Sequence, residues 1–142
     1  MSNTKVIERS CLSADAALDA VRAGISAGRD LGVHVSVAVC GPGMELIAFT
    51  KGDGATPHSA ETSRRKAQTS ASTRRATGWM PAGLAVELPM ASGNVLTNIP
   101  GGVPVFVDGA FAGAIGIAGG TVEQDASIAA AVLEAIGGKS NI

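Results

Sequence analysis

The sequence predicts one α+β domain in which helices pack on a five-stranded antiparallel sheet. Apolar residues alternate with other residues over 33–40, which is the period of a half-buried strand. Asp108 and Gly109 separate two apolar runs, a pattern that favours a tight β-hairpin. Apolar residues at helical spacing lie both before and after these strands, so we expect helices to cover the sheet.

The expected elements follow the order α-β-β-α-β-β-β-α. Apolar periodicity predicts helices over residues 14–31, 57–75 and 122–136. The expected strands are 33–40, 45–50, 94–99, 103–107 and 110–118. The segment between residues 78 and 93 is expected to be irregular, with one helical turn near 82–88.

Capping residues support the three helix starts. Ser13 is expected to cap the first helix, because its hydroxyl can accept a hydrogen bond from a free backbone N–H. Thr56 followed by Pro57 suggests an N-cap with proline in the first turn. Thr121 and Gln124 have the spacing of a capping box.

Length and composition indicate a single domain over residues 1–142, with a core of about 13–137. The chain has 142 residues, 46% of them hydrophobic and only 3% aromatic. That small-residue core suggests a homo-oligomer, in which a partner subunit supplies part of the burial. A net charge of −1 gives no basis for nucleic-acid binding. No apolar run can span a bilayer and no secretory signal is visible, so we expect no membrane attachment and a cytoplasmic location.

Four stretches of the chain resemble the GlcG/HbpS family, and the same domain resembles the C-terminal domain of PduO-type cobalamin adenosyltransferases. They read VHVSVAVCGPGMELIAFTKGDGA, RRKAQTSA, IPGGVPVFVDGAFAGAIGIAGG and QDASIAAAVL. The resemblance implies a profilin-like or roadblock-like fold, heme or a corrinoid as ligand, and association into dimers or larger assemblies. It also implies a role accessory to a catabolic pathway. Cys40 departs from the family pattern, because it takes the Asp position of the Asp-x-x-Gly motif that ends at Gly43.

Two glycine pairs are candidate walls of a ligand pocket. Gly101 and Gly102 precede one strand of the last hairpin, and Gly119 and Gly120 follow the other. Glycines permit close approach of a ligand, and the second pair leads into a helix N-terminus that favours anions. The alternative is that both pairs serve turn geometry alone.

Lys66, Asp53 and His58 are the candidate catalytic residues. Lys66 falls on the Lys-Ala pair of the family and could hold a carboxylate or act as a base or amine nucleophile. Asp53 could transfer a proton, or simply form an Asx turn before glycine. His58 could bind heme iron or act as an acid or base, or be an exposed polar residue. The sequence contains no metal-ligand spacing.

These observations leave two main functions open. The first is a binder of a small molecule, heme or corrinoid by resemblance, with Lys66 and the glycines contacting the ligand. The second is a cofactor-independent enzyme acting on a small carboxylated metabolite, with Lys66 and the glycine turns binding the anion and Asp53 or His58 moving a proton. A third, weaker hypothesis is an interaction module that acts through oligomerisation.

Overall fold

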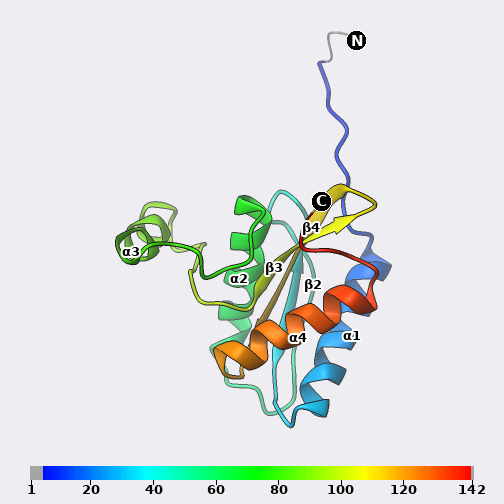
Figure 1. The fold of residues 1–142 in the computed structure, drawn as a ribbon, viewed down its shortest axis with the longest axis vertical. Helices are drawn as coiled ribbons and strands as arrows, with labels where there is room; N and C mark the ends of the chain where they lie inside the picture. The colour runs from blue at the N-terminus through cyan, green and yellow to red at the C-terminus, as the bar shows by residue number, and fades with distance from the viewer. Residues whose placement is uncertain (1–4, 142) are drawn as a thin grey trace.

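The computed structural model describes residues 5–141 and has three layers, with one sheet between two layers of helices (Figure 1). In chain order the elements are α1 (Ala14–Asp30), β1 (Ser36–Cys40), β2 (Leu46–Lys51), α2 (Ser59–Thr73), α3 (Ala82–Ala91), β3 (Gly102–Val107), β4 (Ala110–Ala118) and α4 (Val122–Ala135). Helices α1 and α4 cover one face of the sheet, and α2 covers the other.

The sheet has four strands among the described residues, not five. Their order is β2-β1-β4-β3, and every neighbouring pair is antiparallel. The strand expected at 94–99 is wrong, because that segment pairs with no strand and bonds instead to side chains. The backbone N–H of Thr97 donates to the Thr69 hydroxyl at 2.9 Å, and that of Ile99 donates to the Thr97 hydroxyl at 3.3 Å. The single turn expected near 82–88 is instead the ten-residue helix α3.

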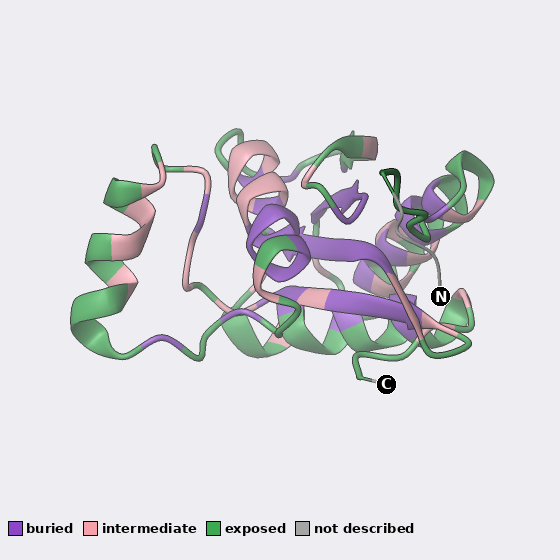
Figure 2. Ribbon diagram, turned by 90° about the horizontal axis from the view of Figure 1, so that it is seen from above, coloured by how far each residue is buried: buried purple, intermediate pink, exposed green. Residues whose placement is uncertain are grey.

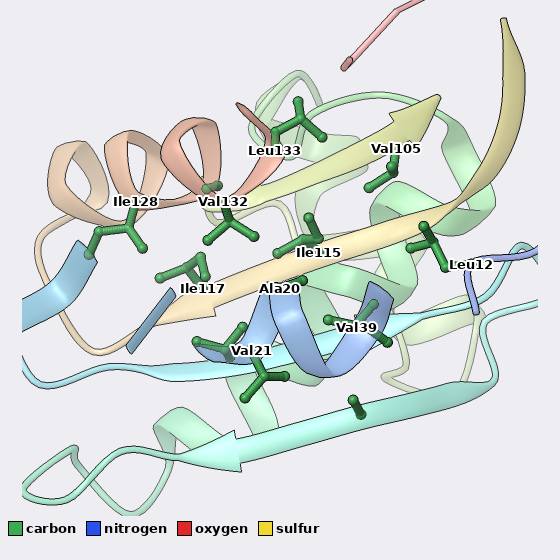
Figure 3. Close-up of a cluster of buried hydrophobic side chains, with 14 of the residues drawn as sticks. Leu12, Ala20, Val21, Val39, Val105, Ile115, Ile117, Ile128, Val132 and Leu133 are labelled. Carbon is green, nitrogen blue, oxygen red and sulfur yellow. The ribbon is translucent and has the colours of Figure 1, made fainter. Parts of the chain in front are cut away.

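Strand β1 is buried on both faces, so its expected half-buried character is wrong. Val37 and Val39 point into the main hydrophobic core with α1 and α4, part of which Figure 3 shows. Ala38 and Cys40 point the other way, into a second cluster of small residues beneath α2. The alternation of side chains was predicted, but the helix on the second face was not apparent from it.

Helix α2 lies directly against the backbone of β3 and β4. At Gly116, an added Cβ would come within 2.6 Å of the backbone nitrogen of Ala67 in α2. At Gly102, it would come within 2.8 Å of the Thr77 side chain, just beyond α2. The strand glycines therefore set how closely this helix can approach the sheet.

Capping residues and turn residues correctly predicted the starts of α1 and α4 and the last hairpin. The Ser13 hydroxyl accepts from the Ala16 backbone N–H at 3.0 Å, and the Thr121–Gln124 capping box is complete. Positive φ angles of 49° and 80° at Asp108 and Gly109 form the predicted tight turn.

The start of α2 differs from the prediction that Thr56 caps it. The helix begins at Ser59, and the preceding His58 makes no side-chain capping hydrogen bond. The Thr56 backbone carbonyl instead accepts from the Ser59 hydroxyl at 2.6 Å. This extra turn before the helix places His58 at the entrance of the hollow described below.

Helix α3 stands away from the rest of the molecule on two connecting segments, as Figures 1 and 2 show. None of its residues is buried. We call residues 82–91 the α3 arm. Within the described residues, no helix has both the length and the apolar character needed to cross a bilayer.

Candidate functional site

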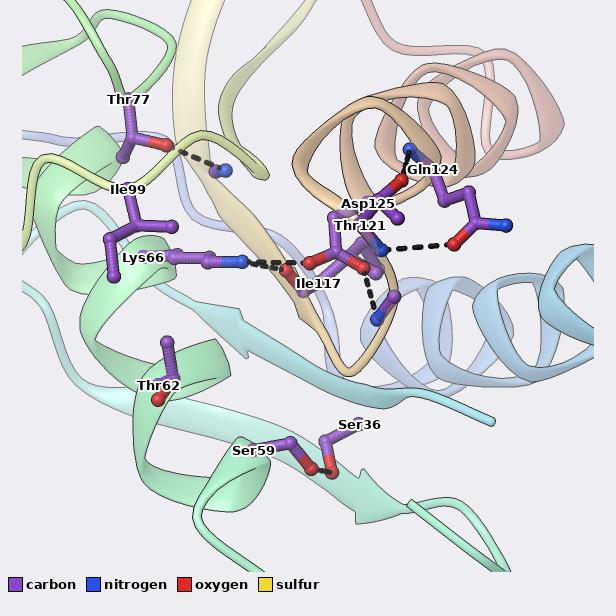
Figure 4. A network of polar contacts seen from close by, with 12 residues as sticks. Ser36, Ser59, Thr62, Lys66, Thr77, Ile99, Ile117, Thr121, Gln124 and Asp125 are labelled. Carbon is purple, nitrogen blue, oxygen red and sulfur yellow. Dashed lines mark hydrogen bonds and ion pairs between the residues drawn. The ribbon is translucent and has the colours of Figure 1, made fainter. Parts of the chain in front are cut away.

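Lys66 connects three elements of the fold from the middle of α2. Its ammonium donates to the Ile117 carbonyl of β4 at 2.7 Å and to the Asp125 carboxylate of α4 at 3.0 Å (Figure 4). Only 1% of Lys66 and 2% of Asp125 is exposed. Two of the three ammonium N–H groups therefore have partners, and the third has none among the described residues.

Asp125 supplies the anion that the start of α4 favours. One carboxylate oxygen accepts from the Gly120 backbone N–H at 2.9 Å, and the other faces Lys66. The carboxylate therefore fixes the Gly119–Gly120 turn and neutralises the buried ammonium at once. Burial nevertheless lowers the pKa of Lys66 below its ordinary value of 10.5, although the Asp125 charge and hydrogen bond oppose that shift.

A cavity of about 290 Å³ opens beside this ion pair, and we call it the Lys66 cavity. It lies where the start of α2 meets the turn between β4 and α4. Its α2 wall is polar, and Ile99, Ala118 and Val122 supply its apolar surface. The lining residues are Thr56, His58, Ser59, Thr62, Lys66, Ile99, Ala118, Gly119, Gly120, Val122 and Asp125.

A larger hollow of about 690 Å³ lies between the α3 arm and α2, and we call it the arm groove. Thr62, Ile99 and Val122 line both hollows, which are therefore neighbours, and we call the two together the joined hollow. The arm contributes Ala85 and Pro89 to the groove. The other lining residues come from α2 and the segment before β3, and they are Arg65, Asn94, Leu96, Thr97, Asn98 and Pro100.

Arg65 and His58 give the joined hollow its cationic and titratable groups near the surface. The Arg65 guanidinium lies 3.1 Å from a Glu61 carboxylate oxygen, with 38% of its side chain exposed. Arg64 binds the same carboxylate, and its hydrogen bond is the main reason why the pKa of Glu61 is lowered. The His58 imidazole takes part in none of the hydrogen bonds of the described residues, so both ring nitrogens are available.

The structure brings together four of the seven residues selected from the sequence. Lys66, His58, Gly119 and Gly120 all line the Lys66 cavity. Asp53 does not join them. It is exposed and lines a separate hollow of about 300 Å³ beside Arg29, His34 and Lys51.

Gly101 and Gly102 lie behind Lys66 and outside the lining of the Lys66 cavity. A Cβ on Gly101 would lie 2.8 Å from the Lys66 ammonium nitrogen. The backbone N–H of Gly102 donates to the Thr77 hydroxyl at 2.9 Å. Gly101 therefore makes room for the lysine side chain, and Gly102 makes room for the backbone of α2 at Lys66.

Sequence reasoning missed the residue that pairs with Lys66. Asp125 lies 59 positions from Lys66, so no local pattern relates the two residues. The QD pair of the family resemblance contained it and was the one available signal. Arg65 and Ile99 also lie in stretches that carry the resemblance, but only the folded chain places them on one groove.

Comparisons with known proteins assign the chain to a family. The model described as "Haem degrading protein HbpS-like" matches residues 12–134. The chain belongs to the HbpS-like family. It is 37% identical over 115 residues to the protein GlcG of Escherichia coli K12, covering 80% of this chain and 83% of that protein.

Solved structures of two relatives share the fold of this HbpS-like protein. The PduOC:heme complex is 26% identical with a TM-score of 0.84, covering 93% of this chain and 99% of that one. A double mutant of Streptomyces reticuli HbpS is 30% identical with a TM-score of 0.82, covering 94% and 92%. The predicted resemblance to the GlcG/HbpS family is therefore confirmed.

Proposed function

We propose that this HbpS-like protein binds heme in the joined Lys66 cavity and arm groove. The observation that carries the proposal is that Thr62, Ile99 and Val122 line both hollows, so a ligand that contacts these residues can reach the more apolar arm groove and the polar Lys66 cavity. The arm groove alone measures about 690 Å³, a volume common among small-molecule and cofactor pockets. Heme is a flat apolar ring that carries carboxylates, so its ring suits the apolar part of the joined hollow and its carboxylates suit the polar part.

The available donors suit a heme iron better than a free metal ion. Within the described part of the chain, no group of three or more His, Cys, Asp or Glu side chains could hold a metal by itself. A heme iron needs only an axial ligand, since the porphyrin supplies the other nitrogens. His58 is exposed at the edge of the Lys66 cavity and its imidazole is free to be that ligand. Bound heme would supply an iron centre that can change its oxidation state.

Other residues of the joined hollow suit the porphyrin ring and the propionates of heme. Leu96, Ile99 and Val122 form the apolar wall against which a porphyrin face would pack. Arg65 lies in the groove and Lys66 has an unused N–H, so each can bind a propionate. The heme complex of PduOC and the name of the matching family support the same ligand class.

A hemin titration followed by absorbance tests the proposal. Saturable binding with a shifted Soret band is expected, and His58→Ala should lose the shift. The matched control is His34→Ala, the other histidine of the chain, which lines neither the Lys66 cavity nor the arm groove. One of the hollows it does line borders the Lys66 cavity at Thr56, Gly119 and Gly120, so the control tests whether the iron ligand is on the α2 side. A Soret shift no larger than that of hemin mixed with an unrelated acidic protein would refute heme binding. An equal loss in His34→Ala would refute the assignment of His58.

The buried Lys66–Asp125 pair favours a second candidate function, catalysis on a small carboxylated metabolite. A cavity-lining ammonium with one free N–H can bind a carboxylate, and His58 lies on the same cavity to move a proton. Asp53 lies in a different hollow, so His58 takes the acid–base role in this candidate. The test is substrate consumption in a panel of small carboxylates followed by NMR. Turnover should be lost in His58→Ala, and turnover that persists in that variant would contradict the assignment.

A further inference from the structure

The hollow that contains Asp53 is a second concave surface, and we call it the His34 hollow. It measures about 300 Å³. Its residues come from the last turns of α1, the segment that leads into β1, and the end of β2 with the loop that follows. It shares no lining residue with the Lys66 cavity or the arm groove. Its ligand is therefore independent of the heme proposal.

The His34 hollow carries a surplus of positive charge in a chain whose net charge is −1. Arg29 and Lys51 both line it, and Asp53 is the one acidic side chain among the described residues of its wall. Within residues 5–141 neither Arg29 nor Lys51 forms an ion pair, whereas Lys66 and both arginines of α2 do. A concave surface with two unpaired cations raises the local concentration of anions.

The loop after β2 holds one wall of the hollow in place. The Gly52 backbone N–H donates to the Val35 carbonyl at 2.9 Å, and the Ala55 N–H donates to the Gly52 carbonyl at 3.0 Å. A Cβ added at Gly54, whose φ is +84°, would lie 3.1 Å from Cγ of the His34 ring. Glycine at this position therefore lets the loop pack against the imidazole. The backbone thus fixes where the ring lies.

Apolar side chains line the same hollow and indicate that its ligand contains carbon. Ile25, Val33 and Val35 all contribute to its wall. Val35 belongs to the main core, and the other two pack against it, so this part of the wall is fixed. A hydrated inorganic ion gains nothing from such a surface, whereas an organic molecule buries part of its hydrocarbon there. The volume suits a small molecule, since pockets for such ligands begin at about 300 Å³.

Asp53 narrows the class of ligand further. An ionised carboxylate only accepts hydrogen bonds, and it repels a second anion. A ligand whose anionic group lies on Arg29 and Lys51 must therefore present a donor to Asp53. An ammonium group would be repelled by the same two cations, so a hydroxyl group is the better match.

We propose that the His34 hollow binds a small organic oxyanion, a phosphate monoester or a carboxylate, that also carries a hydroxyl group. Arg29 binds the anionic group with two parallel N–H donors, and Lys51 adds a point charge. The apolar wall covers the carbon atoms, and Asp53 accepts from the hydroxyl group. Asp53, selected from the sequence as a candidate for proton transfer, is in this proposal a ligand-binding residue of a second site.

An NMR titration of the full chain, labelled with ¹⁵N, tests the proposal. The probes are glycerol 3-phosphate and glycerate, each added at constant ionic strength. Saturable shifts are expected at the amides of residues 33–35 and 50–54, and the tighter of the two probes identifies the anionic group. Arg29→Gln and Lys51→Gln should each weaken binding about tenfold, because each removes a charge-assisted contact.

Arg22→Gln is the matched control, because it removes the same charge from the same helix. The Arg22 side chain is 76% exposed, pairs with Asp19 and lies outside the hollow. Its substitution should leave the affinity unchanged. All these positions are exposed, so the variants should keep the fold, and their spectra verify that. An equal loss of affinity in Arg22→Gln would overturn the proposal, as would the absence of saturable shifts with both probes.

Methyl phosphate, which has no hydroxyl group, tests the role of Asp53. The natural chain should bind it less tightly than glycerol 3-phosphate, and Asp53→Ala should remove most of that preference. Equal affinity of the natural chain for the two compounds would overturn the assignment of a hydroxyl-bearing ligand. A preference that is unchanged in Asp53→Ala would do the same for Asp53.

Discussion

At the scale of single residues, the central feature is a buried ion pair that the fold places beside a cavity. A buried charge is costly unless a partner neutralises it. The Asp125 carboxylate neutralises the Lys66 ammonium, and the Ile117 carbonyl accepts a second hydrogen bond from it. Gly101 leaves the space that the lysine side chain occupies. Removal of either charge alone would leave the other uncompensated, so the two residues should behave as a unit.

We expect Lys66→Met alone to lower the free energy of unfolding by about 3–5 kcal/mol, because Asp125 would then be a buried carboxylate without its cation. The double variant Lys66→Met and Asp125→Leu should recover most of that loss. Urea denaturation of the natural chain and the variants gives both values. Additive losses in the double variant would show that the residues are not coupled.

The lowered pKa of Lys66 has a consequence for stability at alkaline pH. Between that lowered pKa and the ordinary value of 10.5, the unfolded chain binds a proton that the folded chain does not. The free energy of unfolding should therefore gain from this group as pH rises through that range. The comparison is the pH dependence of the urea midpoint in the natural chain and in the Lys66→Met, Asp125→Leu double variant. The rise should be absent from the variant, and equal slopes would contradict the prediction.

At the scale of elements, the closeness of α2 to the sheet positions the site. Helix α2 carries His58 at its start and Lys66 in its middle, so its height above β4 fixes where both side chains lie. That height is set by glycine, because the Cβ of any other residue at 116 would meet the helix backbone. The gap between α2 and β4 is therefore too narrow to admit a methyl group.

Gly116→Ala should lower the free energy of unfolding by about 1–3 kcal/mol, since α2 must move away from β4 to admit the methyl group. The same displacement should weaken hemin binding. The control is Gly83→Ala, where nothing lies within 4 Å of an added Cβ and alanine favours the helix. Thermal denaturation and a hemin titration measure the two effects. A Gly116→Ala variant as stable as the control would refute the packing argument.

At the scale of the whole molecule, the joined hollow lies between parts that are far apart in sequence. It collects residues from α2, the segment before β3, the β4–α4 turn and the α3 arm. A ligand that fills it contacts only the folded chain, and binding must then stabilise the fold as a unit.

Hemin at about a hundredfold its Kd should therefore add about 2.7 kcal/mol to the free energy of unfolding. For a domain of this size the melting temperature should rise by roughly 5–10 °C. Melting followed by circular dichroism measures the shift, which should shrink in His58→Ala and persist in His34→Ala. An unchanged melting temperature at saturating hemin would place any bound heme outside the native hollow.

Features that depend on neighbouring residues were predictable. The Thr121–Gln124 box and the Asp108–Gly109 turn follow from short segments whose backbone hydrogen bonds are made locally, and this turn also sets where β4 begins. The expected strand at 94–99 failed for the opposite reason. Its residues had a strand-like composition, but in the folded chain the Thr97 backbone N–H bonds to the Thr69 side chain on α2, and the segment pairs with neither edge strand of the sheet.

The sequence by itself determined the family, the α+β class and the caps of α1 and α4, and it selected Lys66, His58, Gly119 and Gly120, which the structure places on one cavity. Tertiary structure alone decided that β1 is covered on both faces, that Asp125 pairs with Lys66, and that Asp53 lies in another hollow. The reason is physical. Periodicity and capping act over a few residues, whereas burial and charge pairing depend on which distant segments the packed core brings together.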